Sequence, residues 1–387
     1  MKKLADNILS WCDNPEKGAI KQAINISKHP WLVGNVCLMP DTHEGYGMPI
    51  GGVVALDNAI CPNMVGVDIG CGMLAVKTSL TEISTEQLKK IMGIIREKIP
   101  VGFKHHAKPQ EHDILGNHAF EWEWKYKDVC ENEFEKAKFQ LGTLGGGNHF
   151  IEIQKGNDGH IWFMIHSGSR NLGKKVADYY IDLAKRMCKM WKHDDLVKNE
   201  LCIFPMYTDE SHNYINEMEL CLAFSNANRE LMAKRIKEAF ETVIGDVSFN
   251  DDINIQHNYA ALENHYGKNV WVHRKGATLA RKGTIGIIPG SQGTSSYIVE
   301  GKGNEASLCS CSHGAGRKLS RKKARECLNL EEEKRILDEK GIIHAIRNVE
   351  DLDESSSAYK NIDEVMEQQK DLVDILVKLE PLAVVKG

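Results

Sequence analysis

Apolar side chains recur every three or four residues in several stretches of the chain, which is the spacing of a helix with one buried face. The clearest case follows residues 84–87 (sequence STEQ), a capping-box pattern after which the periodicity continues until Pro100. The same periodicity predicts further helices at residues 174–191, 217–240 and 362–379, and one or two helical turns within residues 1–30.

Short runs rich in Val, Ile and Leu predict strands between these helices. They lie at Val33–Met39, Gly52–Leu56, Met73–Leu80, Phe150–Gln154, Ile161–Ile165, Val270–Val272, Ile285–Ile288 and Leu382–Val385. The pattern of residues 101–140, which are polar and rich in histidine, assigns no element. Strands and helices alternate irregularly, without an internal repeat or a Pro/Ser-rich linker. We therefore expect a single α+β domain over residues 1–387, in which several loops converge on one site.

Composition places the chain among globular proteins with a sizeable core, at 42% hydrophobic and 27% charged residues. The net charge of −5 means that any nucleic-acid surface must be a local basic patch. No apolar run reaches the roughly 20 residues that span a bilayer, and no signal peptide is expected at Met1. The eleven cysteines lack the spacing of a disulfide framework, so a cytoplasmic protein with reduced thiols is expected.

Residues 309–317 (sequence CSCSHGAGR) hold the densest group of reactive side chains, and a basic run follows up to Arg325. The pattern allows either a metal loop formed by two cysteines and His313 or an anion-binding loop in which His313 is reactive. The small residues after His313 would let a phosphate approach it. A neutral imidazole can attack phosphorus as a nucleophile.

Asp68 and Cys71 are flanked by glycines at positions 66, 70 and 72, which would let the backbone turn tightly enough for both side chains to reach one point. A carboxylate and a thiolate can bind a divalent ion, and a thiolate can bridge two. The alternative is a tight turn with a buried cysteine. Three histidines beside Gly or Asn at expected strand ends favour the metal interpretation: His149, His166 and His257. Such a ligand set suits Mn²⁺, Zn²⁺ or Fe²⁺ better than Mg²⁺ or Ca²⁺.

Residues 167–171, 273–278 and 289–296 mix glycines with hydroxyls or cations, which is typical of loops that bind phosphate. Together with the basic run they indicate a substrate with several phosphates, although the run could also be a solvated helix face. Metal ligands and phosphate loops narrow the chemistry to phosphoryl or nucleotidyl transfer or to phosphoester hydrolysis. The motif GxxxxGK[ST] of P-loop enzymes does not occur.

These motifs, taken in order, resemble the RtcB family of GTP-dependent RNA ligases, which join RNA 3′-phosphate or 2′,3′-cyclic phosphate ends to 5′-hydroxyl ends. The stretches that carry the resemblance are 39–45, 67–72, 145–152, 166–170, 257–259, 273–277, 312–317 and 385–387. The resemblance implies the family's mixed α/β single domain. It also implies a dinuclear site in which Cys71 bridges two Mn²⁺ ions held by Asp68, Cys71, His149, His166 and His257.

By the same resemblance, His313 attacks the α-phosphate of GTP, releases pyrophosphate and becomes guanylylated. The guanylate then passes to the RNA 3′-phosphate, and the 5′-hydroxyl displaces GMP. The nucleotide-binding residues implied are Asn148, Glu152, Ser291, Ser296, His313, Gly314, Ala315, Gly316 and Lys386, among which Glu152, Ser296 and Lys386 would recognise guanine. The residues implied to hold phosphates of GTP or RNA are Arg170, Lys275, Arg317 and Arg321.

The protein archease is an expected partner beside RNA, and the cysteines at positions 309 and 311 are then expected to be packing residues. Two other functions are compatible with the same residues. One is a dinuclear metal-dependent phosphoesterase, in which His313 would be a bystander. The other is a non-catalytic protein that binds RNA ends.

Overall fold

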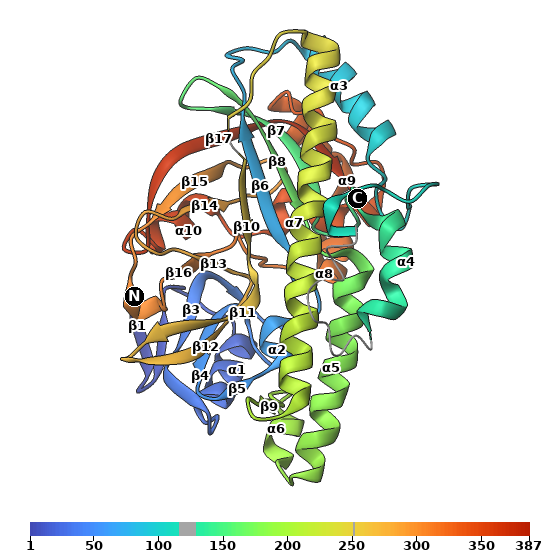
Figure 1. The fold of residues 1–387 in the computed structure, drawn as a ribbon. Helices are drawn as coiled ribbons and strands as arrows, with labels where there is room; N and C mark the ends of the chain where they lie inside the picture. Colours follow the sequence, from blue (N-terminus) through green and yellow to red (C-terminus); the bar gives the residue numbers. More distant parts are fainter. Residues whose placement is uncertain (116–128, 251) are drawn as a thin grey trace.

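Two large β-sheets, two further sheets of two strands each and the helices packed against them make up the fold (Figure 1), which a computed structural model describes for residues 1–115, 129–250 and 252–387. The helices are α1 (Lys17–Ser27), α2 (Pro62–Val65), α3 (Thr85–Lys98), α4 (Cys130–Gln140), α5 (Arg170–Met190), α6 (Asp194–Lys198), α7 (Asp209–Ile244), α8 (Arg321–Cys327), α9 (Leu330–Glu339) and α10 (Ile362–Gln368). The strands are β1 (Lys2–Ala5), β2 (Ile8–Ser10), β3 (Leu32–His43), β4 (Ile50–Leu56), β5 (Ala59–Ile60), β6 (Gly72–Lys77), β7 (Phe150–Gly156), β8 (Ile161–Ser167), β9 (Phe204–Pro205), β10 (Ile253–Gln256), β11 (Asn258–His265), β12 (Lys268–Lys275), β13 (Ala277–Leu279), β14 (Ile285–Ile288), β15 (Ser296–Gly301), β16 (Ser310–Ser312) and β17 (Val373–Lys386).

The larger sheet is antiparallel and has the strand order β10-β6-β8-β7-β17-β15-β14. One face packs against α3 and α7, where Phe163 of β8 meets Phe240 of α7 at a ring-centroid distance of 6.0 Å. On the other face Trp162 of β8 shares a core cluster with Ile298 of β15. The sheet is curled, because its two edge strands, β10 and β14, come close to each other.

The smaller sheet has the order β1-β2-β3-β4-β12-β11, in which only β2 and β3 run parallel. A second core cluster fills the space between this sheet and helices α1, α2, α5 and α7. The 36-residue helix α7 contributes to both cores and runs along both sheets in Figure 1. The expected mixed helix-and-sheet architecture is confirmed.

The expected helix starts are mostly confirmed. Ser84 caps α3, and its side chain and that of Gln87 form the reciprocal hydrogen bonds of a capping box. Helices α5 and α7 cover the periodic stretches after residue 170. Helix α5 begins before its predicted start and ends one residue before its predicted end, whereas α7 extends beyond both predicted bounds. Residues 101–140, to which the pattern assigned nothing, contain α4. No helix in the described parts of the chain combines the length and apolarity needed to cross a bilayer.

The predicted helix at residues 362–379 is wrong in its second half. Helix α10 ends at Gln368, and the chain enters β17 at Val373. β17 lies between β15 and β7 and pairs with both. Hydrogen bonds to two distant strands therefore outweigh the local helical periodicity. The strand predicted at Leu382–Val385 is the end of β17.

Candidate active site

Neighbouring strands of the larger sheet bring the predicted metal ligands together at one end of the sheet. His166 of β8 pairs with Met73 of β6 on one side and with Phe150 of β7 on the other. Cys71 directly precedes β6, and His149 directly precedes β7. His257 follows β10, whose last residue pairs with the first of β6. Five ligands from four chain segments thus meet because the strands are adjacent, although they lie far apart in the sequence.

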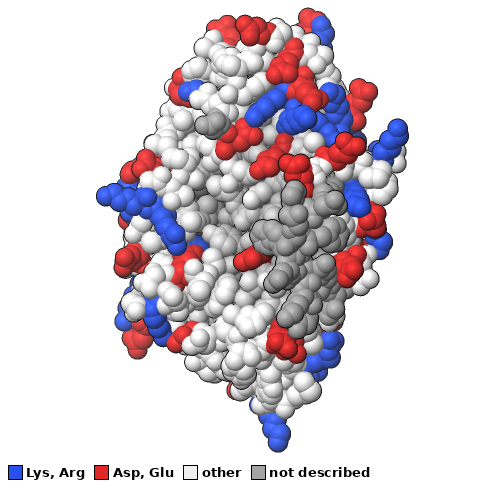
Figure 2. All heavy atoms as spheres, in the orientation of Figure 1, with Lys and Arg blue, Asp and Glu red and all other residues white. Residues whose placement is uncertain are grey.

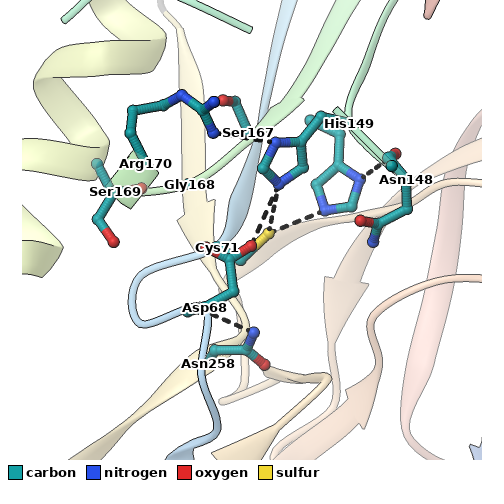
Figure 3. Close-up of polar contacts among 12 residues, drawn as sticks. Asp68, Cys71, Asn148, His149, Ser167, Gly168, Ser169, Arg170 and Asn258 are labelled. Atoms are coloured by element: carbon teal, nitrogen blue, oxygen red, sulfur yellow. Dashed lines mark hydrogen bonds and ion pairs between the residues drawn. The ribbon is translucent and has the colours of Figure 1, made fainter. Parts of the chain in front are cut away.

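The ligand atoms form two triplets that share one sulfur. Cys71 Sγ lies 3.4 Å from His149 Nε2 and 3.2 Å from His166 Nε2, and Asp68 Oδ2 lies 3.2 Å from His149 Nε2 (Figure 3). The donor atoms of Asp68, Cys71 and His149 lie within 4.8 Å of one another, and so do those of Cys71, His166 and His257. The shared thiol is the arrangement expected of a ligand that bridges two ions.

Hydrogen bonds to the rings of His149 and His166 leave the lone pair of each Nε2 directed at the candidate metal site. The Nδ1 atoms of His149 and His166 contact the carbonyl oxygens of Leu144 and Asn148 at 3.0 and 3.1 Å. Since a carbonyl only accepts, each Nδ1 donates, and each Nε2 keeps its lone pair toward Cys71. The Nδ1 of His257 is buried without a hydrogen-bond partner in the described structure. A divalent cation would satisfy that orphaned nitrogen.

The pKa shifts that burial causes in the candidate ligands also fit a bound cation. Burial, together with the charges of neighbouring histidines, lowers the pKa of His166 and His257 well below the usual value, so both rings are neutral as metal ligands require. Burial and then the charge of Asp68 raise the pKa of the Cys71 thiol well above its usual value. A bound divalent cation would reverse that effect and stabilise the thiolate. The residues therefore fit a dinuclear metal centre.

The middle of α7 holds the ligand-bearing loops in place. Ser225 and Arg229 donate to the carbonyl oxygen of Gly70, next to Cys71, with Arg229 Nη1 at 3.1 Å. Arg229 also reaches Ser167 O at 2.9 Å. Asn228 accepts from Gly142 N at 2.7 Å and donates to the carbonyl oxygens of Thr143 and Gly168 at 3.2 and 3.1 Å. One helical turn thus clamps the loops before and after three metal ligands.

The amphipathic pattern of residues 217–240 predicted a helix but not this clamp. A signal was present: Ser225, Asn228 and Arg229 have i, i+3 and i+4 spacing and share the apolar face with Cys221 and Phe224. Polar side chains at such positions need buried partners.

Replacing Asn228 with alanine is expected to weaken the binding of divalent metal ions at this candidate centre by about 10–100-fold, the range for partners that orient metal ligands. The variant loses the side chain that fixes the turn before His149 and the loop after His166. Calorimetric titration with Mn²⁺ measures the change, with Lys234→Ala on the exposed face of α7 as the control. If Asn228→Ala bound Mn²⁺ like the wild type while melting at a lower temperature, Asn228 would support only the fold.

His313 stands beside the metal cluster and is oriented by a buried carboxylate. Its Nδ1 lies 2.6 Å from Asp41 Oδ2, and its backbone N–H donates to the same oxygen at 3.1 Å. The His313 ring lies 4.8 Å from that of His257, measured between centroids. Because Nδ1 donates to Asp41, the Nε2 lone pair is free for a substrate. Asp41 lies within the 39–45 motif, yet nothing in the sequence pattern predicted that it would orient His313.

A cavity of about 710 Å³ opens beside His313. All predicted nucleotide-binding residues line it: Asn148, Glu152, Ser291, Ser296, His313, Gly314, Ala315, Gly316 and Lys386. Two of the predicted phosphate-binding residues, Arg317 and Arg321, also line it. The volume is within the usual range for small-ligand sites. Cys311, by contrast, packs in a hydrophobic core cluster, which favours the anion-binding interpretation of this stretch over the metal loop.

The other two predicted phosphate-binding residues lie outside the cavity wall. Arg170 Nε donates to Thr143 Oγ1 at 3.1 Å, and its Nη1 lies 3.5 Å from His149 Nδ1, at the back of the metal cluster. Lys275 is buried, and its Nζ donates to Asn63 O at 3.0 Å and to Tyr46 O. In this structure both side chains are engaged with the protein.

The fold and the site define a mixed helix-and-sheet protein with a candidate dinuclear metal centre beside a ligand-sized pocket. The sequence model of the family described as "tRNA-splicing ligase RtcB" matches residues 22–387. The chain therefore belongs to the RtcB family, as the motifs indicated.

Curated relatives match over nearly their full lengths. The RNA-splicing ligase RtcB of Escherichia coli (strain K12) is 36% identical, covering 96% of this chain and 95% of that protein. The tRNA-splicing ligases RtcB of Nanoarchaeum equitans and Thermococcus kodakarensis are 34% and 30% identical, covering 96% and 95% of this chain and 92% and 91% of those proteins.

Proposed function

We propose that this protein is an RNA ligase that joins RNA 3′-phosphate or 2′,3′-cyclic phosphate ends to 5′-hydroxyl ends, with GTP and two Mn²⁺ ions. It would act as one catalytic domain over residues 1–387. The observation that carries the proposal is the position of His313, whose Nδ1 is held by Asp41 and whose ring borders both the metal cluster and the cavity. A phosphoesterase would need the cluster but not an oriented histidine.

His313 would act as the nucleophile toward the α-phosphorus of GTP. Its Nε2 lone pair forms the P–N bond, the bond to the bridging oxygen breaks, and pyrophosphate leaves with that electron pair. No proton has to leave Nε2, because the ring proton is on Nδ1 and is held by Asp41. The buried carboxylate stabilises the positive charge that develops on the imidazole.

The metal ions would be held by Asp68, Cys71, His149, His166 and His257, and their chemistry is to offset negative charge on the phosphates. Arg321 and the small residues after His313 would receive phosphates in the cavity. Glu152 and Lys386 offer a carboxyl group and an ammonium group to a base that presents both donors and a carbonyl, as guanine does. We propose Ser291, Ser296 and Asn148 as further nucleotide contacts on the same wall.

The RNA would enter across the basic run 317–325. Lys and Arg are interspersed with Asp and Glu over the described part of the face in Figure 2, so a local cluster must provide most of the charge contacts. In α8 the Lys322 side chain is 82% exposed and that of Arg321 is 50% exposed. Archease is proposed as a partner on the family resemblance. The eleven cysteines are all free thiols, which supports a location in the reducing environment of the cytoplasm.

The deciding experiment incubates the protein with α-labelled GTP and Mn²⁺, and then with RNA fragments bearing a 3′-phosphate and a 5′-hydroxyl. We expect an acid-labile, alkali-stable protein adduct and a joined RNA, with α-labelled ATP as the control nucleotide. Release of phosphate from the RNA end without GTP would instead support a phosphoesterase. Binding of RNA ends with neither reaction would support a non-catalytic role.

GTP binding is expected to release protons at pH 7. Burial raises the pKa of the Glu152 carboxyl to about 8, despite a hydrogen bond from Gln154 that lowers it, so the free enzyme carries this group mostly protonated. Guanine N–H groups favour the carboxylate, so binding expels the proton, and affinity should rise by up to about tenfold per unit between pH 6 and 7.5.

Calorimetry in buffers of different ionisation enthalpy measures the number of protons released. Glu152→Gln should bind GTP more weakly and release fewer protons. Proton uptake by the wild type, or the same release from Glu152→Gln, would show that Glu152 is not the titrating group.

A further inference from the structure

One buried carboxylate, Glu354, connects side chains from three segments of the pocket wall. Its oxygens lie 3.0 Å from Arg317 Nη1, 3.1 Å from Arg321 Nε and 3.5 Å from Lys386 Nζ. The Tyr359 hydroxyl also donates to it. Arg317 follows β16, Arg321 begins α8, and Lys386 ends β17. All five residues line the cavity beside His313.

Glu354 also forms part of a partition. A second cavity of about 260 Å³ shares Gln292, Glu354 and Lys386 with the first. Gln292 Nε2 donates to the backbone carbonyl of Glu354 at 2.9 Å, which fixes this wall from the side of β15. Only 4% of Glu354 is exposed, so solvent does not compete for its carboxylate.

The cationic side chains around Glu354 keep its carboxyl group ionised. Burial alone would raise the pKa of Glu354, but the charges of Lys386 and Arg317, together with the hydrogen bond from Tyr359, outweigh it and hold the pKa at about 2. Glu354 is therefore ionised at neutral pH. Without it, three cations would face one another in a largely buried wall, where Asp353 is the other carboxyl group whose charge acts on Arg321 and Lys386.

Arg317 is held in place by several partners besides the carboxylate of Glu354. Its Nε donates to Leu319 O at 3.0 Å, its Nη1 to Glu354 and to the Tyr359 hydroxyl at 3.0 and 3.1 Å, and its Nη2 to the Asp353 carbonyl. With all three nitrogens engaged, Arg317 is a structural part of the wall. Arg321 uses Nε for Glu354 and has a half-exposed side chain, so it is better placed to receive a phosphate.

Lys386 is the group through which Glu354 would affect base recognition. Its Nζ lies 5.7 Å from the centre of the Phe150 ring, and its charge acts on Glu152. An ammonium donor held at this point matches the carbonyl of guanine and opposes the amino group that adenine presents there. The carboxylate of Glu354, at 3.5 Å from Nζ, holds that donor in place together with the carbonyl oxygen of Gly147 at 3.4 Å.

We propose that Glu354 is a positioning residue of the nucleotide pocket, which holds Lys386 for the base and Arg321 for the phosphates and so sets GTP affinity and selectivity for guanine over adenine. This inference rests on the proposed function. The opposite role would be a resident anion that GTP must displace, in which case removing the charge would strengthen GTP binding.

The test is Glu354→Gln, measured by the rate of self-guanylylation against GTP concentration. We expect the KM for GTP to rise about tenfold while kcat changes by less than about threefold, since Glu354 does not touch His313. The preference for GTP over ATP should fall by about tenfold.

The matched control is Glu263→Gln. Glu263 is also buried and pairs with Arg274, Arg281 and His265, but it lies outside the cavity wall. This variant should lose stability while keeping the wild-type KM and base preference. Tyr359→Phe removes one hydrogen bond to Glu354 and should also raise the KM for GTP, by a smaller factor than Glu354→Gln. It replaces Glu354→Gln as the test if that variant does not fold.

The proposed function and the positioning role of Glu354 can fail independently in these experiments. If the wild type forms no adduct, the proposed function fails. If the wild type forms the adduct and folded Glu354→Gln keeps its KM and base preference, or binds GTP more tightly, the positioning role is wrong. An equal change in KM in Glu263→Gln would also overturn it, because general destabilisation would then explain the effect.

Discussion

Replacing His313 with alanine is expected to abolish the covalent nucleotide adduct and RNA joining together. The alanine variant lacks the only imidazole nitrogen that the described structure places at the cavity with its partner nitrogen held by a carboxylate. Losing a covalent nucleophile removes the whole chemical pathway, so the expected fall in rate is at least about 10⁴-fold. Autoradiography of protein incubated with α-labelled GTP and Mn²⁺ measures the adduct.

A second variant, Asp41→Asn, should slow adduct formation without removing the nucleophile. Asp41→Asn keeps the His313 ring but replaces the carboxylate that holds its Nδ1 proton, so the adduct should form at least about a hundredfold more slowly. GTP binding without chemistry should persist in His313→Ala. A labelled adduct that survives in His313→Ala would place the nucleophile elsewhere and contradict the mechanism.

Replacing Cys71 with alanine is expected to remove the metal centre as a functional unit. Its sulfur is the one atom common to both ligand triplets, so the substitution takes a ligand from each ion. We expect fewer than two Mn²⁺ ions bound per chain and joining reduced by at least about 10³-fold. Equilibrium dialysis with Mn²⁺ gives the stoichiometry independently of activity.

Cys37→Ala is the matched control for that experiment. Cys37 is also fully buried, but it lies in β3, and its thiol contacts the carbonyl oxygen of Ala306 at 3.2 Å. This variant should lose some stability and keep wild-type metal stoichiometry. Two Mn²⁺ ions bound by Cys71→Ala with unchanged affinity would refute the bridging role.

Much of the site could be predicted from local sequence because three of its candidate ligands, Asp68, Cys71 and His149, lie in glycine-rich turns. Gly70 and Gly147 both have positive φ, at 74° and 70°, and each stands one or two residues from a metal ligand. Such backbone shapes favour glycine, so the motif is visible in the sequence. The helix α3 was predictable for a similar reason, since its capping box is local.

Other parts depend on contacts between distant segments and left no local signal. The chain enters β17 where the periodicity favoured a helix, because β15 and β7 offer hydrogen bonds on both sides. Lys275 belongs to a stretch whose sequence is typical of phosphate-binding loops, yet it is the last residue of β12 and its ammonium group donates to two backbone carbonyls. Glu354 is an ordinary acidic residue in the sequence and becomes the anion of the pocket wall only after three segments meet.

The sequence by itself determined the family and predicted the metal-ligand types and the reactive histidine, because each depends on residue chemistry within short local motifs. The tertiary structure alone decided which groups orient them: Asp41 for His313, the α7 clamp for the ligand loops, and Glu354 for the pocket cations. These partners are separated by tens to hundreds of residues along the chain. Burial makes an unpaired charge or polar group costly, so the fold, rather than the local pattern, selects each partner.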